Sequence, residues 1–280
     1  MANYTANDIK QLRDITGAGM LDVKKALDEA NGDIAKATEI IRIKGLKGVA
    51  KRESRATSEG IVAAKVVNAE QNQVGYIVEL NSETDFVAKS AKFIDLANSV
   101  LEAVITSQAN SVQAALQVKI GQSTVEENIN NTAAILGEKV VLNSVHRLEA
   151  PSVTLYLHKT AKDLPPSIAV LVATDIEASG VAKDVAQHIA ALAPKYLSVE
   201  NIPVEVIDTE SKVAKEIAQN EGKPENIIPK IVEGRLKAFY KDVVLLDQPL
   251  AKDPSITVSQ LISKAGGKLI NYFRVRVGQG

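Results

Sequence analysis

A weak internal repeat is the sequence feature that most limits the folds open to this chain of 280 residues. When the sequence is shifted by 94 positions, residues 74–89 fall on residues 168–183. The preceding residues 61–66 fall on 155–160 under the same shift and share Lys65/Lys159. Each copy has alternating apolar residues followed by a helical pattern, so we expect two related strand-strand-helix units. The identical pairs in the longer segment are Val78/Val172, Glu83/Glu177, Val87/Val181, Ala88/Ala182 and Lys89/Lys183.

Residues 81–89 join the strand and the helix of the first copy and include Phe86, one of four phenylalanines in the chain. In one interpretation, Thr84 or Asp85 caps the helix and Phe86 is folded into the core, which agrees with the usual burial of phenylalanine. In the other, Phe86 is an exposed anchor for a pocket on a partner. The second copy has Ala178-Ser179-Gly180 at these positions. Because the second copy does without equivalents of Asp85 and Phe86, we favour the functional interpretation.

The remaining patterns predict an α+β chain in four parts. Residues 1–55 are expected to form three helices with a basic linker, and the second helix carries Leu21, Val23, Ala26, Leu27 and Ala30. Residues 56–150 form a first core subdomain, with later helical stretches at 111–120 and 123–136 and a strand at 140–148. Residues 151–199 and 242–280 form a second core subdomain. Residues 200–241 are interrupted at Gly222-Lys223-Pro224 and are expected to be an inserted antiparallel helical hairpin.

The basic linker, residues 42–55, has six basic residues and one acidic residue, Glu53. Such a stretch can bind nucleic acid or an acidic protein face, or it can be a solvated linker. We favour the linker because no aromatic residue is interleaved to stack on bases. The formal net charge of −1 also argues against bulk binding to nucleic acid or a membrane surface.

Composition and motifs favour a binding protein over an enzyme. The chain has no cysteine, which excludes disulfides and thiolate nucleophiles and suits a reducing cytosol. We find no phosphate-binding loop or nucleophile elbow, and His146, His158 and His188 are too scattered to suggest a metal cluster. We expect His188 to be structural, and His158 to be either an edge filler or a contact residue. With no leader pattern and no apolar run near the ~20 residues of a membrane span, we expect a soluble, cytoplasmic protein with no catalytic residue, metal or cofactor.

Several short motifs occur in an order and spacing that resemble one known family. They are Thr16-Gly17-Ala18-Gly19-Met20 with Lys24-Lys25-Ala26-Leu27, Ala30-Asn31-Gly32-Asp33, Thr84-Asp85-Phe86-Val87-Ala88, His188-Ile189-Ala190-Ala191 and Val232-Glu233-Gly234-Arg235. Over nearly its whole length, the chain resembles the bacterial elongation factor Ts family.

The resemblance implies both a fold and a function. The fold would be a ubiquitin-associated-like domain of three helices, a core of two related subdomains and an inserted helical hairpin. The function would be guanine nucleotide exchange on elongation factor Tu, in which GDP release follows a disturbance of the Mg²⁺ and phosphate site. The residues that would contact Tu are Thr84, Asp85, Phe86 and Val87 in the first subdomain, Gly17, Ala18, Gly19 and Met20 in the N-terminal domain, and His158 in the second subdomain.

The expected partners follow from the same resemblance. Tu would be bound as a protein, without direct nucleotide binding and without nucleic acid or membrane, and a homodimer through the hairpin stays open. The family's Gln-Pro-Phe is Gln248-Pro249-Leu250 here, which puts a contact at Leu250 in doubt. Two alternatives are a nucleic-acid-binding adaptor that uses the basic linker, and a hydrolase with an unrecognised site at Asp85 or His158.

Overall fold

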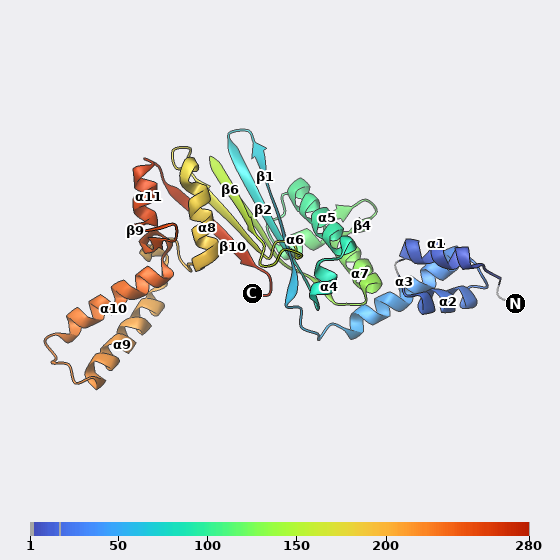
Figure 1. The fold of residues 1–280 in the computed structure, drawn as a ribbon, viewed down its shortest axis with the longest axis horizontal. Coiled ribbons are helices and arrows are strands. Elements are labelled where there is room, and N and C mark those ends of the chain that lie inside the picture. Colours follow the sequence, from blue (N-terminus) through green and yellow to red (C-terminus); the bar gives the residue numbers. More distant parts are fainter. Residues whose placement is uncertain (1–2, 17, 280) are drawn as a thin grey trace.

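The computed structural model describes residues 3–16 and 18–279 and has an elongated shape (Figure 1). A central body of two β-sheets and their covering helices lies between a helical module at the N-terminal end and a pair of helices at the opposite end. The predicted mixture of helix and sheet is confirmed. In the described part of the chain, no helix is both long and apolar enough to cross a membrane.

The N-terminal module consists of α1 (Ala6–Thr16), α2 (Met20–Glu29) and α3 (Ile34–Lys51). Glycine at position 32 allows the tight turn before α3, where φ is +87°. The prediction of a solvated linker is wrong up to Lys51, because residues 42–51 are part of α3. The last turns of α3 pack on the central body through Gly45 and Val49. The core of the module is formed by Leu12, Val23, Ala26, Leu27, Ala30 and Ala37.

The first sheet has the antiparallel order β1-β2-β5, with β1 (Glu59–Ala69), β2 (Asn72–Ser82) and β5 (Val140–Ala150). Its outer face is covered by α5 (Ala91–Ser107), α6 (Val112–Leu116) and α7 (Val125–Leu136), which enclose an apolar core around Phe93. The predicted helix at 111–120 is too long, because α6 ends at Leu116. The chain then turns through Gly121, and β3 (Lys119–Ile120) pairs with β4 (Ser123–Thr124).

The second sheet has the antiparallel order β10-β7-β6, with β6 (Ser152–His158), β7 (Ile168–Thr174) and β10 (Leu269–Arg276). Its outer face is covered by α8 (Ala182–Leu192) and α11 (Val258–Lys264). Between these helices the chain forms α9 (Val204–Asn220) and α10 (Ile228–Val243), which lie side by side (Figure 1). A short pairing that the sequence did not indicate joins β8 (Pro249–Leu250) to β9 (Asp253–Thr257).

The two sheets share one topology, with a central strand followed by a helix and then an edge strand. The pairing of β2 with β5 has a register shift between Glu79 and Leu80. The pairing of β7 with β10 has a shift between Leu269 and Asn271 of β10, opposite Thr174 and Ala173, which are the same positions after a shift of 94. The alignment of the first strands is wrong by three residues. Ile61 pairs with Leu80 but Ser152 pairs with Thr174, which is a shift of 91. The longer connection 159–167, against 70–71 in the first copy, absorbs the difference.

The inner faces of the two sheets pack directly on each other. Gly75 marks the closest approach, because a Cβ at this position would lie 2.6 Å from Leu171 Cδ2 and 2.9 Å from Val153 Cγ1. Close-packed interiors resist relative movement of their layers. The buried residues of this interface are Val62, Ile77, Leu148, Ala150, Val153, Ala169, Leu171, Ala173 and Val275.

A buried carboxylate joins the end of the chain to the first sheet. Glu79 is 1% exposed and accepts hydrogen bonds from Asn143 Nδ2 at 2.9 Å and Ser144 Oγ at 3.1 Å. The backbone N–H of Gly278 donates to its other oxygen at 3.1 Å. A buried carboxylate is costly unless it is hydrogen-bonded, and these three donors satisfy it. The bond from Gly278 fixes the residues after β10 against β2.

Candidate functional site

The Phe86 loop, residues 82–90, leaves the end of β2 and contains the short helix α4 (Asp85–Ala88). Thr84 is the N-cap of α4, and its hydroxyl accepts a hydrogen bond from the Val87 N–H at 3.4 Å. Phe86 is 73% exposed, so its ring is not folded into the core. The first interpretation predicted that Thr84 or Asp85 caps the helix and that Phe86 is buried. Thr84 is the cap, but Phe86 is exposed.

The backbone of the Phe86 loop is held on both sides. The Thr84 N–H donates to Glu138 Oε2 at 3.0 Å and its hydroxyl donates to Glu138 Oε1 at 2.6 Å. On the other side of Phe86, Val87 is 8% exposed and Ala88 is 1% exposed, and both face the core. Val87 was predicted to contact a partner, but its burial restricts it to holding α4 in place. An exposed aromatic ring is therefore presented by a fixed backbone.

The bond from the Thr84 hydroxyl to Glu138 predicts a measurable stability effect. Replacing Thr84 with valine should lower the free energy of unfolding by about 1–2 kcal/mol, because it removes both the cap and a partner of Glu138. Ser111→Ala is the matched control, since Ser111 caps α6 through the Ala114 N–H at 3.2 Å. It should cost only the cap, about 0.5–1 kcal/mol. Urea unfolding of both variants measures the difference, and equal losses would contradict the role of Glu138.

Glu83 ties the Phe86 loop to two other segments. Its carboxylate accepts from the Lys139 N–H at 2.7 Å and pairs with Arg55 Nη1 at 3.0 Å. Lys139 Nζ in turn donates to the carbonyl oxygens of Glu53 at 2.6 Å and Arg55 at 3.0 Å. Burial would raise the pKa of Glu83, but the Lys139 N–H and the Arg55 guanidinium outweigh burial and hold this pKa below its usual range.

This depressed pKa predicts a pH dependence of stability. In the unfolded chain, the pKa of a glutamate carboxyl group is about 4.3. The ionised Glu83 therefore stabilises the fold above that pH, and this contribution is lost as the pH falls through the lower pKa of the folded state. We expect the unfolding free energy of the parent to exceed that of Glu83→Gln by a constant amount near neutrality. The difference should shrink below about pH 4. Chemical unfolding at several pH values measures it, and a difference that is independent of pH would contradict the assignment.

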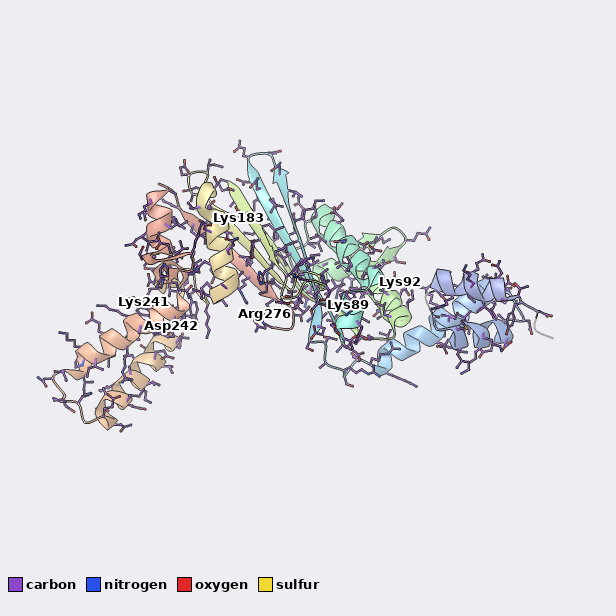
Figure 2. All side chains as sticks on the ribbon, viewed as in Figure 1. Lys89, Lys92, Lys183, Lys241, Asp242 and Arg276 are labelled. Atoms are coloured by element: carbon purple, nitrogen blue, oxygen red, sulfur yellow. The ribbon has the colours of Figure 1, made fainter. Side chains whose placement is uncertain are left out.

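A charge pair flanks the exposed ring. Lys89 Nζ lies 4.5 Å from the centroid of the Phe86 ring and 3.3 Å from Asp85 Oδ2. Figure 2 shows Lys89 and Lys92 on the same part of the central body, at α4 and the start of α5. An apolar anchor surrounded by charged groups is the usual composition of a protein-binding hot spot and its rim.

A groove of about 390 Å³ continues from Lys89 to the second sheet. One wall is β1 with α5, and the other is Leu157 of β6 with the connection after it. Lys159 and Lys162 add positive charge to this second wall. His158 is exposed at the end of β6, and its Nδ1 lies 3.1 Å from the Tyr156 hydroxyl. The groove therefore runs from the Phe86 loop to the end of β6, where it is lined by the neighbours of His158 and not by His158 itself.

The N-terminal contact predicted from the sequence lies at the start of α2. Gly17 falls outside the described residues. Ala18 is partly buried, and Gly19 is the N-cap of α2, where its carbonyl accepts from the Val23 N–H at 3.0 Å. Met20 is 63% exposed and the neighbouring Leu21 is 66% exposed.

Leu21, one of the apolar residues expected on the second helix, is on the surface beside Met20. The buried residues of α2 are Val23, Ala26 and Leu27, and Ala30 follows them. These positions repeat with helical spacing, and Leu21 lies outside the stripe. That spacing was the signal in the sequence, and it would have identified Leu21 as a second exposed apolar residue.

The other residues singled out from the sequence are structural. His188 is buried, and its Nδ1 accepts from the Ala251 N–H at 3.0 Å, which leaves Nε2 to donate to Gln248 Oε1 at 2.8 Å. Burial lowers the pKa of His188, which favours this neutral form. Leu250 is 3% exposed, so it belongs to the core. Among the described residues, no group of three or more His, Asp or Glu could hold a metal ion.

The basic stretch is partly neutralised by acids. Lys44 Nζ pairs with Glu29 at 2.6 Å, and Arg55 pairs with Glu83. Figure 2 also shows Lys183 and Lys241 on the second half of the molecule, away from this stretch. Basic groups that are paired or dispersed do not form the continuous patch typical of nucleic-acid binding.

Comparison with known proteins gives a consistent result. A family model described as "Elongation factor TS" matches residues 83–279. The chain is 56% identical over 280 residues to elongation factor Ts of Beutenbergia cavernae, with 99% of this chain and 100% of that protein covered. It is 55% identical over 279 residues to elongation factor Ts of Kocuria rhizophila, again with 99% and 100% covered. Elongation factor Ts of Bifidobacterium longum subsp. infantis is 49% identical, with 100% of this chain and 99% of that protein covered.

Proposed function

The chain belongs to the elongation factor Ts family, and on that premise we propose that it is a guanine nucleotide exchange factor for elongation factor Tu in translation elongation. The observation that carries this proposal is Phe86, an aromatic side chain that is 73% exposed on a loop with a fixed backbone. A monomer gains nothing from exposing this ring, whereas a protein interface uses such rings as anchors.

We propose that the Phe86 loop acts on the Mg²⁺ and phosphate end of the nucleotide site of Tu. The ring would enter an apolar pocket between helices of the nucleotide-binding domain. Asp85 and Lys89 would then lie at the edge of the contact, where their charges stay hydrated and set the orientation. Thr84 supports this contact through Glu138.

Exchange of this kind requires differential binding and no catalytic group on this chain. A protein that binds the nucleotide-free state better than the GDP-bound state lowers GDP affinity by the same factor, because coupling is reciprocal. A ~10⁴-fold effect requires about 5.5 kcal/mol of differential binding. Burial of one phenylalanine supplies roughly 1.5–3 kcal/mol, so further contacts must contribute.

We propose two such contacts. Ala18, Gly19, Met20 and the adjacent Leu21 would bind the nucleotide-binding domain of Tu as an apolar patch on the N-terminal module. His158, at the exposed end of β6, would bind another domain of Tu. The groove beside Lys89 extends from the Phe86 loop to Leu157 and Lys159, the two neighbours of His158 in the chain, and His158 itself lies outside its lining.

The proposal is tested by the affinity of this chain for Tu with and without GDP. Titration calorimetry should show binding to nucleotide-free Tu that is tighter by a factor of ~10³ or more than binding to Tu with saturating GDP and Mg²⁺. Equal affinities would overturn the proposal, since a ligand without preference shifts no equilibrium. Binding to RNA in place of Tu, with a steep dependence on salt, would instead favour the nucleic-acid adaptor.

A further inference from the structure

We propose that the contact between Gly45 and Ala134 fixes the orientation of the N-terminal module on the central body. This contact would then set the distance between Phe86 and the Met20 patch, which consists of Ala18, Gly19, Met20 and Leu21. The orientation itself follows from packing in this structure. Its consequence for exchange rests on the proposed function. Gly45 and Ala134 are positioning residues in this proposal, because neither is placed in contact with Tu.

The first observation is that α3 belongs to two cores at once. Its N-terminal half packs Ile34, Ala37 and Ile40 into the core of the N-terminal module. Its C-terminal half packs Val49 against the core of the first sheet. Because α3 is one continuous helix of 18 residues, it behaves as a rigid rod between the two cores. Its placement on the central body therefore determines where the whole module lies (Figure 1).

The second observation is how closely α3 approaches α7. A Cβ at Gly45 would lie 2.6 Å from the Cβ of Ala134 and 3.4 Å from its Cα. Atoms cannot approach to 2.6 Å, so a larger side chain at position 45 must separate the helices. Glycine is a poor residue inside a helix compared with alanine. Its presence within α3 is explained by this contact.

The third observation is a crevice beside the contact, of about 270 Å³. Its walls come from Thr16 and Ala18 of the N-terminal module, from α3, and from Asn131 and Ile135 of α7. An open space therefore lies beside the contact between α3 and α7. If the Gly45 contact were opened, this space would allow the module to tilt without unfolding either core.

Orientation matters because two contacts on one rigid body reinforce each other. When one contact has formed, the second forms at an effective concentration that depends on geometry, and the gain is lost when geometry forbids simultaneous engagement. Tilting the N-terminal module changes the distance and direction from Met20 and Leu21 to Phe86. We therefore expect a weaker apparent affinity for Tu, while the action of the Phe86 loop on bound nucleotide is retained.

The test uses Gly45→Ala with a control on the same helix. Gly48→Ala has the same gain in helix propensity, but its Cβ would meet only the guanidinium of Arg52, at 2.8 Å from Nη2. That guanidinium is the end of a flexible side chain and can move. A double variant, Gly45→Ala with Ala134→Gly, returns the lost space from the other side of the contact.

The first readout is a distance measured by pulsed electron paramagnetic resonance. The chain has no cysteine, so spin labels can be attached at Lys24→Cys on α2 and Ser99→Cys on α5, both exposed positions. We expect the distance distribution to shift or broaden in Gly45→Ala, to stay unchanged in Gly48→Ala, and to return to that of the parent in the double variant. An unchanged distribution in Gly45→Ala would overturn the proposal, and so would a failure of Ala134→Gly to restore it.

The second readout is the concentration dependence of GDP release from Tu. Gly45→Ala should raise the half-saturating concentration about tenfold or more, with a maximal rate within about twofold of the parent, and the double variant should reverse this change. A shifted distance with an unchanged half-saturating concentration would remove the link between orientation and exchange. If the parent itself did not accelerate release, the proposed function would fall, and the distances would still decide the orientation.

Discussion

Phe86→Ala is expected to reduce the acceleration of GDP release from Tu by about 10- to 100-fold while the fold is unaffected. The first part follows from losing roughly 1.5–3 kcal/mol of burial in the partner's pocket, since each 1.4 kcal/mol is about tenfold. The second part follows from exposure. A side chain that is 73% exposed contributes little to the core, so the unfolding free energy should change by less than about 0.5 kcal/mol.

Phe93→Ala is the matched control for this prediction. Phe93 lies on α5, one turn beyond the Phe86 loop, and is 0% exposed. Its truncation should cost about 3–5 kcal/mol of unfolding free energy. Stopped-flow release of a fluorescent GDP analogue and urea unfolding distinguish the two roles. If Phe86→Ala released GDP as fast as the parent, or lost as much stability as Phe93→Ala, Phe86 would not be the anchor.

Gly75→Leu is expected to lower the free energy of unfolding by about 3 kcal/mol. Position 75 lies on β2 directly beneath β7, where a Cβ would be 2.6 Å from Leu171 Cδ2 and 2.9 Å from Val153 Cγ1. A leucine must therefore push the two sheets apart or force its neighbours out of their rotamers. Because Phe86 and His158 lie on different sheets, we also expect weaker binding to Tu.

Gly234→Ala is the control for substitution of a glycine. Position 234 lies in α10, and no described atom lies within 4 Å of the Cβ that would be added there. Alanine should stabilise this exposed helix by up to about 1 kcal/mol. Guanidinium unfolding of both variants gives the comparison. A Gly75→Leu protein as stable as the parent would mean that the two sheets do not pack face to face at this position.

Much of the architecture could be predicted because the repeat and the helical spacing are local signals. The matching register shifts beside Glu79 and Ala173 agree with the alignment of the two central strands. The outer strands were misaligned because a connection of different length precedes each central strand, and self-comparison at one shift cannot detect it. The hairpin β3-β4 was missed because Ser111 and Thr124 are good helix caps. The sequence pattern between them did not show that α6 ends at Leu116 and that the chain turns at Gly121.

The sequence predicted the exposed residue of the candidate site but not the residues that hold its loop in place. Comparison with Ala178-Ser179-Gly180 pointed to Phe86, whereas Glu138 and Lys139 are more than 50 residues away in sequence and were found only in the fold. The extent of α3 was also missed. Its basic residues suggested a solvated linker, while the features that fix it on the central body are a glycine and a valine. Contacts made by small residues leave little trace in a sequence pattern.

The most direct test is stopped-flow release of a fluorescent GDP analogue from Tu, with Mg²⁺ present, in the absence and presence of this chain. We expect release to accelerate with increasing concentration of the chain and to reach a plateau at least ~10²-fold above the intrinsic rate. A release rate that is independent of the chain, under conditions where binding to Tu is detected, would contradict its assignment as a nucleotide exchange factor.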